Sequence, residues 1–266
     1  MLQPNQGFVK PSITYSTALC SCLLLSFLCH GQNNQKAPLF FSSSIINTSE
    51  NSKPFYPALK RKKYIIRKQQ ALIDRFRCFG NPGEPSAFSI TICADVPDNE
   101  HPDKVLLDGK PGHVFLIFSK STGKDTFNTV FGFYPKHAAF LLCRYIRSEI
   151  RDNSYRAYDA CLKRSVNANE FTATLNNAVL FAHKRYHLKK YNCYDYALDI
   201  FNSLPGEKID VIHIRFPFLM GKGGTPCSLY SELKKMKTES AAKNFEISFG
   251  SFLSPMSYRQ NQPMER

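Results

Sequence analysis

The sequence predicts an α+β protein in which an antiparallel sheet packs against helices. Between residues 86 and 135, apolar segments with the alternation typical of strands are separated by short polar turns. Between residues 169 and 204, apolar residues recur at spacings of three and four, which is typical of helices with one buried face. Strands that come first and helices that follow, without regular alternation, favour the α+β class.

Composition indicates a folded protein with an anionic partner. The chain has 266 residues, of which 43% are hydrophobic and 13% aromatic, and this excludes a disordered chain. Its length allows one large domain or two small ones. The net charge of +14 favours nucleic acid, a phospholipid surface or an acidic polymer such as cell-wall material. Charge alone does not choose among these three.

Residues 1–31 carry the features of a signal peptide. Ala18–Cys29 ("ALCSCLLLSFLC") is apolar, has the length of a signal-peptide core and is too short to span a bilayer comfortably. Cys29 and Gly31 stand at positions −3 and −1 of a cleavage site before Gln32. We therefore expect export to a periplasmic or extracellular location, and the alternative is an uncleaved segment that tethers the protein to a membrane. Cleavage would leave a chain of net charge +13.

The cysteine count is compatible with disulfides and with a reactive thiol. Six of the nine cysteines lie beyond residue 31, and an even number in an exported protein predicts a disulfide framework. Spacing of the CxxC type is missing from the sequence, so we expect no structural metal. If one cysteine serves in catalysis, at least one other must be unpaired. The six are Cys78, Cys93, Cys143, Cys161, Cys193 and Cys227.

The regions outside the core domain differ in character. Residues 32–57 are rich in Asn, Ser and Pro and predict a flexible linker. Residues 58–85 form a basic segment with helical tendency, either a solvated helix or an anion-binding face. The folded domain is expected over residues 86–240, and residues 241–266 as a tail in which "NFEISFGSF" has the pattern of an edge strand.

Three strands are predicted at the start of the domain. "AFSITICADV" alternates apolar and small or polar residues, whereas "GHVFLIFS" is apolar on both faces and therefore predicts a central strand. "TFNTVFGFYP" returns beside it after a turn near Thr122–Gly123. This register places His113 opposite Gly132 and puts Tyr134 on the same face. Residues 136–165 give no clear pattern.

Two helices and a further strand are predicted in the second half of the domain. An apolar stripe runs from Phe171 to Tyr186, and a second helix begins at Cys193. "KIDVIHIRFPF" then predicts a strand, and "GKGGTPCSLYSELKKM" predicts a glycine loop followed by a short helix. His183 and His187 have the i, i+4 spacing of a metal-binding pair on one helix, but lysines surround them, and we expect neither a metal nor a cofactor.

Cys193 has the sequence context of a nucleophile. Asn192 is a strong N-cap residue, so Cys193 is expected to be the first residue of its helix. Apolar residues follow at offsets that place the thiol on the inward face, with Tyr194, Asp195 and Asp199 pointing elsewhere. A helix N-terminus and a nearby imidazolium both lower a thiol pKa. His113, at the start of the predicted central strand, is the candidate base. The alternative for Cys193 is a small buried thiol in a core helix.

The order of four motifs resembles a known superfamily. "GHVFLIF", "FGFYP", "YNCYDYALDIFN" and "GGTPCSLYSELK" resemble the permuted branch of the NlpC/P60 and papain-like cysteine hydrolases, which includes lecithin:retinol acyltransferase-like and PPPDE-type proteins, and in particular its exported bacterial members. The resemblance covers residues 86–235. It implies a circularly permuted papain-like fold, with Cys193 as nucleophile and His113 as general base and acid. Tyr196 stands where the motif has phenylalanine, and Val114 where a small or hydroxylic residue is expected.

The group that orients His113 stays open at this point. Tyr134 is the candidate on the neighbouring strand, Asn128 requires another register, and His137 lies just past the strand end. The resemblance implies an amidase or peptidase that cleaves amide bonds through a thioester, with peptidoglycan stem peptides as the favoured substrate and without a cofactor. The alternatives are a lipid acyl hydrolase or acyltransferase of the same fold, which would act at a membrane surface, and an inactive basic binding module. Nucleic acid is not an expected partner.

Overall fold

The computed structural model describes residues 56–80, 86–102, 104–105, 111–123, 125–137, 144–216, 221–239 and 245–258. The predicted signal segment, almost all of the predicted linker and Cys143 lie outside the described residues. Among the helices described, none is both long enough and apolar enough to cross a membrane.

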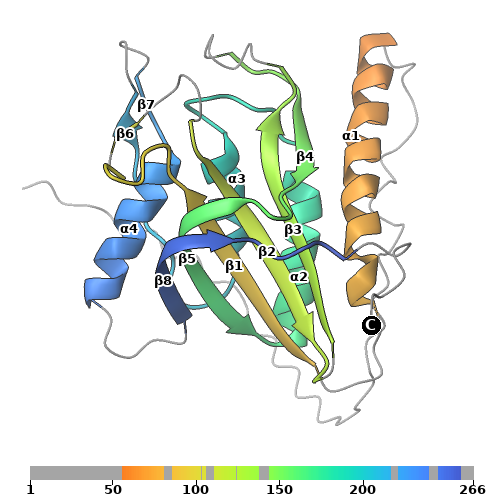
Figure 1. Ribbon diagram of the computed structural model, residues 1–266. Coiled ribbons are helices and arrows are strands. Elements are labelled where there is room, and N and C mark those ends of the chain that lie inside the picture. Colours follow the sequence, from red (N-terminus) through yellow and green to blue (C-terminus); the bar gives the residue numbers. More distant parts are fainter. Residues whose placement is uncertain are drawn as a thin grey trace, which may run out of the picture. The chain divides into compact units, whose positions relative to one another are not determined.

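The centre of the domain is an antiparallel sheet. In the part of the chain that the structure describes, six strands join in the order β4-β3-β2-β1-β5-β8 (Figure 1). The α+β class and the antiparallel sheet predicted from the sequence are thereby confirmed. The strands are β1 (Ala87–Asp95), β2 (His113–Ser121), β3 (Thr126–Pro135), β4 (Ser148–Asp152), β5 (Ala157–Val166) and β8 (Phe245–Leu253).

Strand β2 is central because both of its faces are apolar. It lies between β1 and β3. The hairpin of β2 and β3 closes at the pair Ser121–Thr126, and Phe115 lies opposite Gly132. The register therefore differs by two residues from the predicted one, because the turn is longer than expected. A shift of two residues keeps the side-chain parity, so His113 and Tyr134 still share a face.

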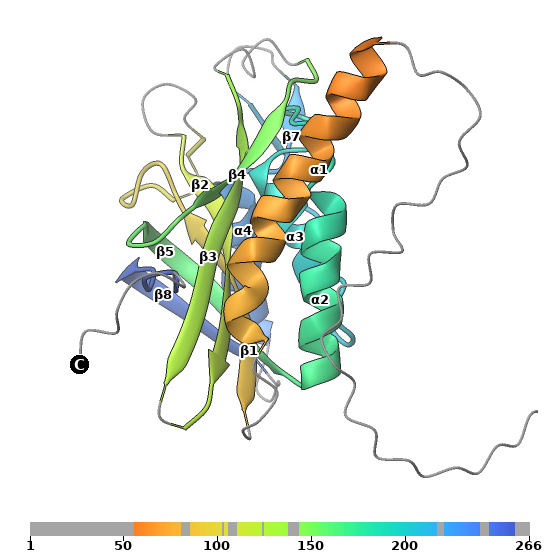
Figure 2. The same ribbon diagram turned by 90° about the vertical axis from the view of Figure 1, so that its right-hand side faces the viewer.

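The helices pack on one face of the sheet (Figures 1 and 2). They share a single core with the inward side chains of β1 and β2, among them Ile92 and Leu116. The opposite face of the sheet carries a smaller cluster around Cys93 and Phe115. The helices are α1 (Tyr56–Phe76), the 3-10 turn η2 (Arg77–Phe79), α2 (Ala168–Phe181), α3 (Cys193–Phe201) and α4 (Pro226–Glu239).

The basic segment is a helix that docks on the domain through one face. Leu72 and Phe76 of α1 are buried, and the Phe76 ring lies 5.5 Å from the ring of Phe131. Lys68 is also buried, and its Nζ donates to Ser148 Oγ at 2.8 Å. The helix is therefore not fully solvated, although Lys63 and Arg67 are exposed.

Helix α2 ends earlier than the apolar stripe predicted. Its N-terminus carries a capping box between Asn167 and Glu170, and the helix stops at Phe181. His183 and His187 thus do not share a helix, which removes the geometry of an i, i+4 metal pair. Among the described residues, no group of three or more His, Cys, Asp and Glu side chains is placed to hold a metal ion.

The strand predicted after residue 206 is wrong for most of its length. Among the described residues of that segment, only β6 (Ile214–Arg215) forms a strand, which pairs with β7 (Lys222–Gly223). The preceding backbone is engaged by side chains instead, because both the N–H and the C=O of Ile209 bond the side-chain amide of Asn202.

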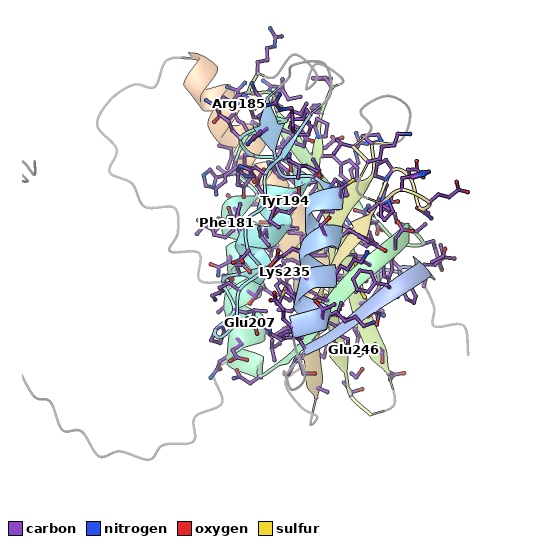
Figure 3. All side chains as sticks on the ribbon, turned by 90° about the vertical axis from the view of Figure 1, so that its left-hand side faces the viewer. Phe181, Arg185, Tyr194, Glu207, Lys235 and Glu246 are labelled. Carbon is purple, nitrogen blue, oxygen red and sulfur yellow. The ribbon has the colours of Figure 1, made fainter. Side chains whose placement is uncertain are left out.

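The end of the described chain contributes to the sheet. Strand β8 pairs with β5 at the sheet edge, so the predicted edge strand within residues 241–266 forms. It contacts α4, where the ring of Tyr230 lies 5.0 Å from that of Phe249. Figure 3 shows the two elements close together, marked by Lys235 and Glu246.

Candidate active site

The N-terminus of α3 is anchored by Asn192. Its Oδ1 accepts from the N–H of Tyr194 at 2.8 Å, and Asp195 returns a bond to the N–H of Asn192, which completes a capping box. Its Nδ2 donates to the carbonyls of Leu188 and Gly224. Cys193 is therefore the first residue of α3, as predicted, and the cap also fixes this helix end to two neighbouring loops.

Helix α3 is buried on more than one side. The prediction that Tyr194 points away from the core is wrong, because its side chain is fully buried. Its hydroxyl accepts from the N–H of Ile212 at 3.0 Å, which supplies the polar partner that a buried tyrosine needs. The N-terminal turn of α3 is thereby held between the sheet and the segment after residue 206.

His113 is the first residue of β2 and follows a glycine that no other residue replaces easily. Gly112 has φ 73°, and a Cβ at this position would lie 2.4 Å from the carbonyl oxygen of Asp95. The ladder between β2 and β3 ends at Phe115–Gly132, although β2 remains paired with β1 and β3 with β4 beyond that point. The two strands therefore diverge here, and His113 lies at the divergence.

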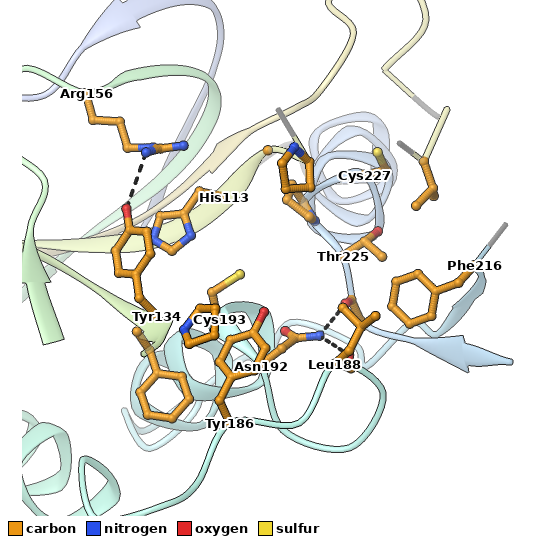
Figure 4. A pocket seen from close by; sticks show the side chains of 17 residues that line it. His113, Tyr134, Arg156, Tyr186, Leu188, Asn192, Cys193, Phe216, Thr225 and Cys227 are labelled. Carbon is orange, nitrogen blue, oxygen red and sulfur yellow. Dashed lines mark hydrogen bonds between the residues drawn. The ribbon is translucent and has the colours of Figure 1, made fainter. Parts of the chain in front are cut away.

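Cys193 and His113 open into the same cavity (Figure 4). The cavity has a volume of about 340 Å³. The backbone N–H of Val114, next to His113, lies close enough to the sulfur of Cys193 to lower the pKa of the thiol. The structure thus brings together the two residues that the sequence predicts as nucleophile and base. The walls include Val105, Pro111, Phe133, Tyr134, Arg156, Leu188, Phe216 and Pro226.

Tyr134 supports the imidazole through its ring and not through its hydroxyl. The rings of His113 and Tyr134 are stacked with centroids 4.1 Å apart. The Tyr134 hydroxyl accepts from Asn153 Nδ2 at 2.5 Å and from Arg156 at 3.3 Å. Tyr134 therefore holds the plane of the His113 ring, but it does not fix the ring by a hydrogen bond.

The other two candidates for the orienting group lie away from the imidazole. Asn128 pairs with Ser119 farther along the β2–β3 hairpin and accepts a bond from its hydroxyl at 2.7 Å. His137 lies past the end of β3 and is exposed.

Asn153 is the residue that the sequence reading missed. It is buried at the turn between β4 and β5, and in the described structure neither its Oδ1 nor His113 Nε2 has a hydrogen-bond partner. Both atoms lie over Gly132, where a Cβ would be 2.2 Å from His113 Nε2 and 2.7 Å from Asn153 Oδ1. The two polar atoms are thus neighbours on the same side of Gly132.

The turn that carries Asn153 contains neither glycine nor proline, the residues that most strongly indicate a turn in a sequence. Tyr155 takes the left-handed conformation with φ 58°, which is uncommon for an aromatic residue. The backbone is held by non-local bonds, including one from Ser254 Oγ to the carbonyl of Asn153 at 2.5 Å. The one feature of the sequence that could have indicated this part of the site is a short polar segment between two strands with weak hydrophobic patterns.

Arg156 extends this network towards β1. Its guanidinium pairs with Asp95 at 2.6 Å and donates to the hydroxyl of Tyr134. The guanidinium of Arg151 lies over the ring of Tyr134, 4.9 Å from its centroid. The imidazole is therefore placed in a buried and cationic environment.

Burial sets the protonation state of both candidate catalytic groups. It raises the pKa of the Cys193 thiol to about 11, against the smaller opposing effects of the Val114 and Tyr194 N–H groups and Arg156. Burial, together with Arg156 and Arg151, holds the pKa of His113 well below its ordinary value. The predicted lowering of the thiol pKa is thus wrong, because the loss of hydration outweighs the helix N-terminus. At neutral pH the site holds a thiol and a neutral imidazole.

Comparisons of the chain with protein-family models, with curated proteins and with solved structures find no match. The arrangement of the site is therefore interpreted from its own chemistry. A thiol at a helix N-terminus, a buried neutral imidazole and a buried amide oxygen beside that imidazole have the chemistry that a nucleophile, a base and an orienting group require.

Proposed function

We propose that the protein is a cysteine-dependent hydrolase with a circularly permuted papain-like fold of the NlpC/P60 type, and that it cleaves amide bonds. The observation that carries the proposal is that Cys193 and His113 line one cavity, with Asn153 Oδ1 on the same side of Gly132 as Nε2 of the imidazole. The order of histidine before cysteine agrees with the motif order of the permuted branch.

Each group has a defined role in the first half of the reaction. In the proposed reaction the imidazole of His113 moves until Asn153 Oδ1 accepts Nε2–H, and this leaves Nδ1 of His113 free to accept a proton. As the proton of Cys193 moves to Nδ1, the sulfur bonds to the substrate carbonyl carbon and the carbonyl oxygen becomes an oxyanion. When the intermediate collapses, the C–N bond breaks and the imidazolium gives its proton to the leaving amine. The product is a thioester on Cys193.

Water completes the cycle. The neutral imidazole takes a proton from water, whose oxygen attacks the thioester carbon, and the C–S bond then breaks. The thiol regains its proton and the acid leaves. The N–H of Cys193, in the first turn of α3, belongs to the group of helix amides without an intrahelical partner and is placed to bind the oxyanion.

Two features support an anionic peptide as substrate. The net charge is +14, and Arg156, whose guanidinium also pairs with Asp95, is the charged residue among those that line the cavity. A guanidinium recognises a carboxylate well. We therefore favour stem peptides of bacterial peptidoglycan, processed outside the cytoplasm by an exported enzyme.

One observation favours a second candidate within the same chemistry. Val105, Leu188 and Phe216 give part of the cavity an apolar wall, and such a wall suits a fatty acyl chain. A lipid acyl hydrolase or acyltransferase at a membrane surface would use the same thiol and imidazole. The same scaffold without activity would be a basic binding module.

The decisive experiment incubates the full-length protein with purified peptidoglycan sacculi and, separately, with phospholipid vesicles. Mass analysis of muropeptides and of released fatty acids identifies the bond that is cleaved. Cys193→Ala and His113→Gln should each abolish product, and Cys78→Ser, a thiol away from the cavity, should not. Unchanged muropeptides together with released fatty acid would move the assignment to the lipid enzyme. Absence of both products, with binding retained in Cys193→Ala, would leave the binding module.

A further inference from the structure

Two cysteines face each other across neighbouring strands, away from the candidate active site. Cys93 of β1 and Cys161 of β5 are direct partners in the antiparallel register. Both belong to the small cluster on the face of the sheet opposite the helices, with Phe115, Ile117 and Val130. Their thiols are therefore on the same side of two paired strands, and both are free in the structure.

The register provides the geometry of a disulfide. Directly opposed residues of an antiparallel pair have Cα atoms roughly 4.5–5.5 Å apart. A disulfide requires a Cα separation of about 4.4–6.8 Å. We propose that Cys93 and Cys161 form a cross-strand disulfide by exchange with an external low-molecular-weight disulfide, and that Cys161 is the thiol that reacts first.

The difference in exposure between the two thiols defines the order of the steps. Cys161 lines a cavity of about 460 Å³ on the helix-free face, together with Tyr158, Lys163 and Ser248. Cys93 is fully buried. A small disulfide can therefore reach Cys161 from the cavity, and Cys93 lies behind it as the resolving thiol.

The exchange balances with one external disulfide, written RSSR. Cys161 loses its proton and its sulfur attacks one sulfur of RSSR; the S–S bond breaks and RS⁻ leaves and takes up a proton. Cys93 then loses its proton and its sulfur attacks that of Cys161 in the mixed disulfide, which releases the second RS⁻. Two protein thiols are oxidised, and RSSR is reduced to two RSH.

The cross-link would join the strands that position the wall of the candidate active site. Cys93 lies two residues before Asp95 on β1, and Arg156 directly precedes β5. The Asp95–Arg156 ion pair spans the same two strands. The disulfide also closes a long loop of the chain, so it should raise the melting temperature by about 10 °C.

The test uses the full-length protein, reduced and then incubated with glutathione disulfide at pH 9. Burial raises the pKa of Cys161, so the exchange is expected to be slower at pH 7 by up to about 100-fold. Peptide mapping without reduction should recover Cys93 linked to Cys161, at the mass of the two peptides less two hydrogen atoms. Cys78→Ser, which removes a thiol outside this pair, should give the same linked peptide.

Variants separate the two steps. In Cys93→Ser and Cys93→Ala, glutathione should remain on Cys161 as a mixed disulfide, because the resolving thiol is gone. The alanine variant keeps the buried position apolar in case serine prevents folding, which circular dichroism checks. The proposal is overturned if wild-type protein keeps both thiols, if glutathione persists on Cys161 in wild type, or if either cysteine is recovered linked to a different one.

Discussion

The thiol of Cys193 should be far less ionised in the folded protein than in the unfolded chain. Burial raises its pKa to about 11, so about one molecule in 10,000 carries the thiolate at pH 7. In the unfolded chain a cysteine with a pKa near 8.5 is roughly 3% thiolate at the same pH. Because alkylation requires the thiolate, folding should slow the reaction of Cys193 with iodoacetamide by about 300-fold at pH 7.

The assay follows carbamidomethylation of Cys193 by peptide mapping between pH 6 and 11. The rate in the folded protein should rise about tenfold for each pH unit up to about pH 11. Protein unfolded in urea is the matched control, because it presents the same cysteine with an ordinary pKa and should reach its maximal rate near pH 9. A comparison of the two curves separates ionisation from access, since poor access lowers the rate equally at every pH.

A rate in the folded protein that levels off below pH 8 would refute this reasoning. It would mean that Cys193 and His113 exist as a thiolate–imidazolium pair before substrate binds. The proposed mechanism instead transfers the proton as the sulfur attacks, and requires a neutral imidazole. Because the pKa of His113 is depressed, hydrolysis should show no loss between pH 8 and 6 from this group and should decline only at lower pH.

Three further outcomes follow from the structure. Gly132→Ala should lower the rate of cleavage about 100-fold and destabilise the fold by about 1–3 kcal/mol, because a Cβ would lie 2.2 Å from His113 Nε2. Gly80→Ala is the control, at a site with more room for a Cβ. Asn153→Ala should lower kcat about 10- to 100-fold with little change in KM. Asn153→Asp should shift the acid limb of the pH–rate profile to higher pH, because a carboxylate raises the pKa of the imidazole. An unchanged rate and an unchanged profile in both variants would exclude Asn153 as the orienting group. Burial lowers the pKa of Lys68 to about 8, so above pH 8 the unfolded chain binds more protons than the folded protein. Between pH 8 and 9.5 the free energy of unfolding of the wild type, measured by urea titration, should therefore rise by about 1.5 kcal/mol relative to that of Lys68→Met. Parallel pH dependence of the two proteins would show that Lys68 keeps an ordinary pKa.

Local patterns in the sequence were enough to predict most of the secondary structure. The continuous apolar run after Gly112 predicted the central strand, and the alternation before it predicted β1. Strands β4 and β5 could not be recognised, because their burial depends on neighbours distant in the chain and their turn contains no glycine. The segment before β6 looked like a strand because its composition suits one, but the side chain of Asn202 takes the backbone groups that a ladder would need.

The sequence by itself determined where the helix of Cys193 begins, because the cap of Asn192 and the spacing of apolar residues act within a few positions of the chain. Only the tertiary structure decided what surrounds that thiol. Asn153 reaches the imidazole of His113 through the pairing of β3 with β4, and Tyr134 stacks on the ring because two strands diverge there. The elevated pKa of Cys193 has the same origin, since removal of water from a thiol is a collective effect of residues that meet only when the chain folds.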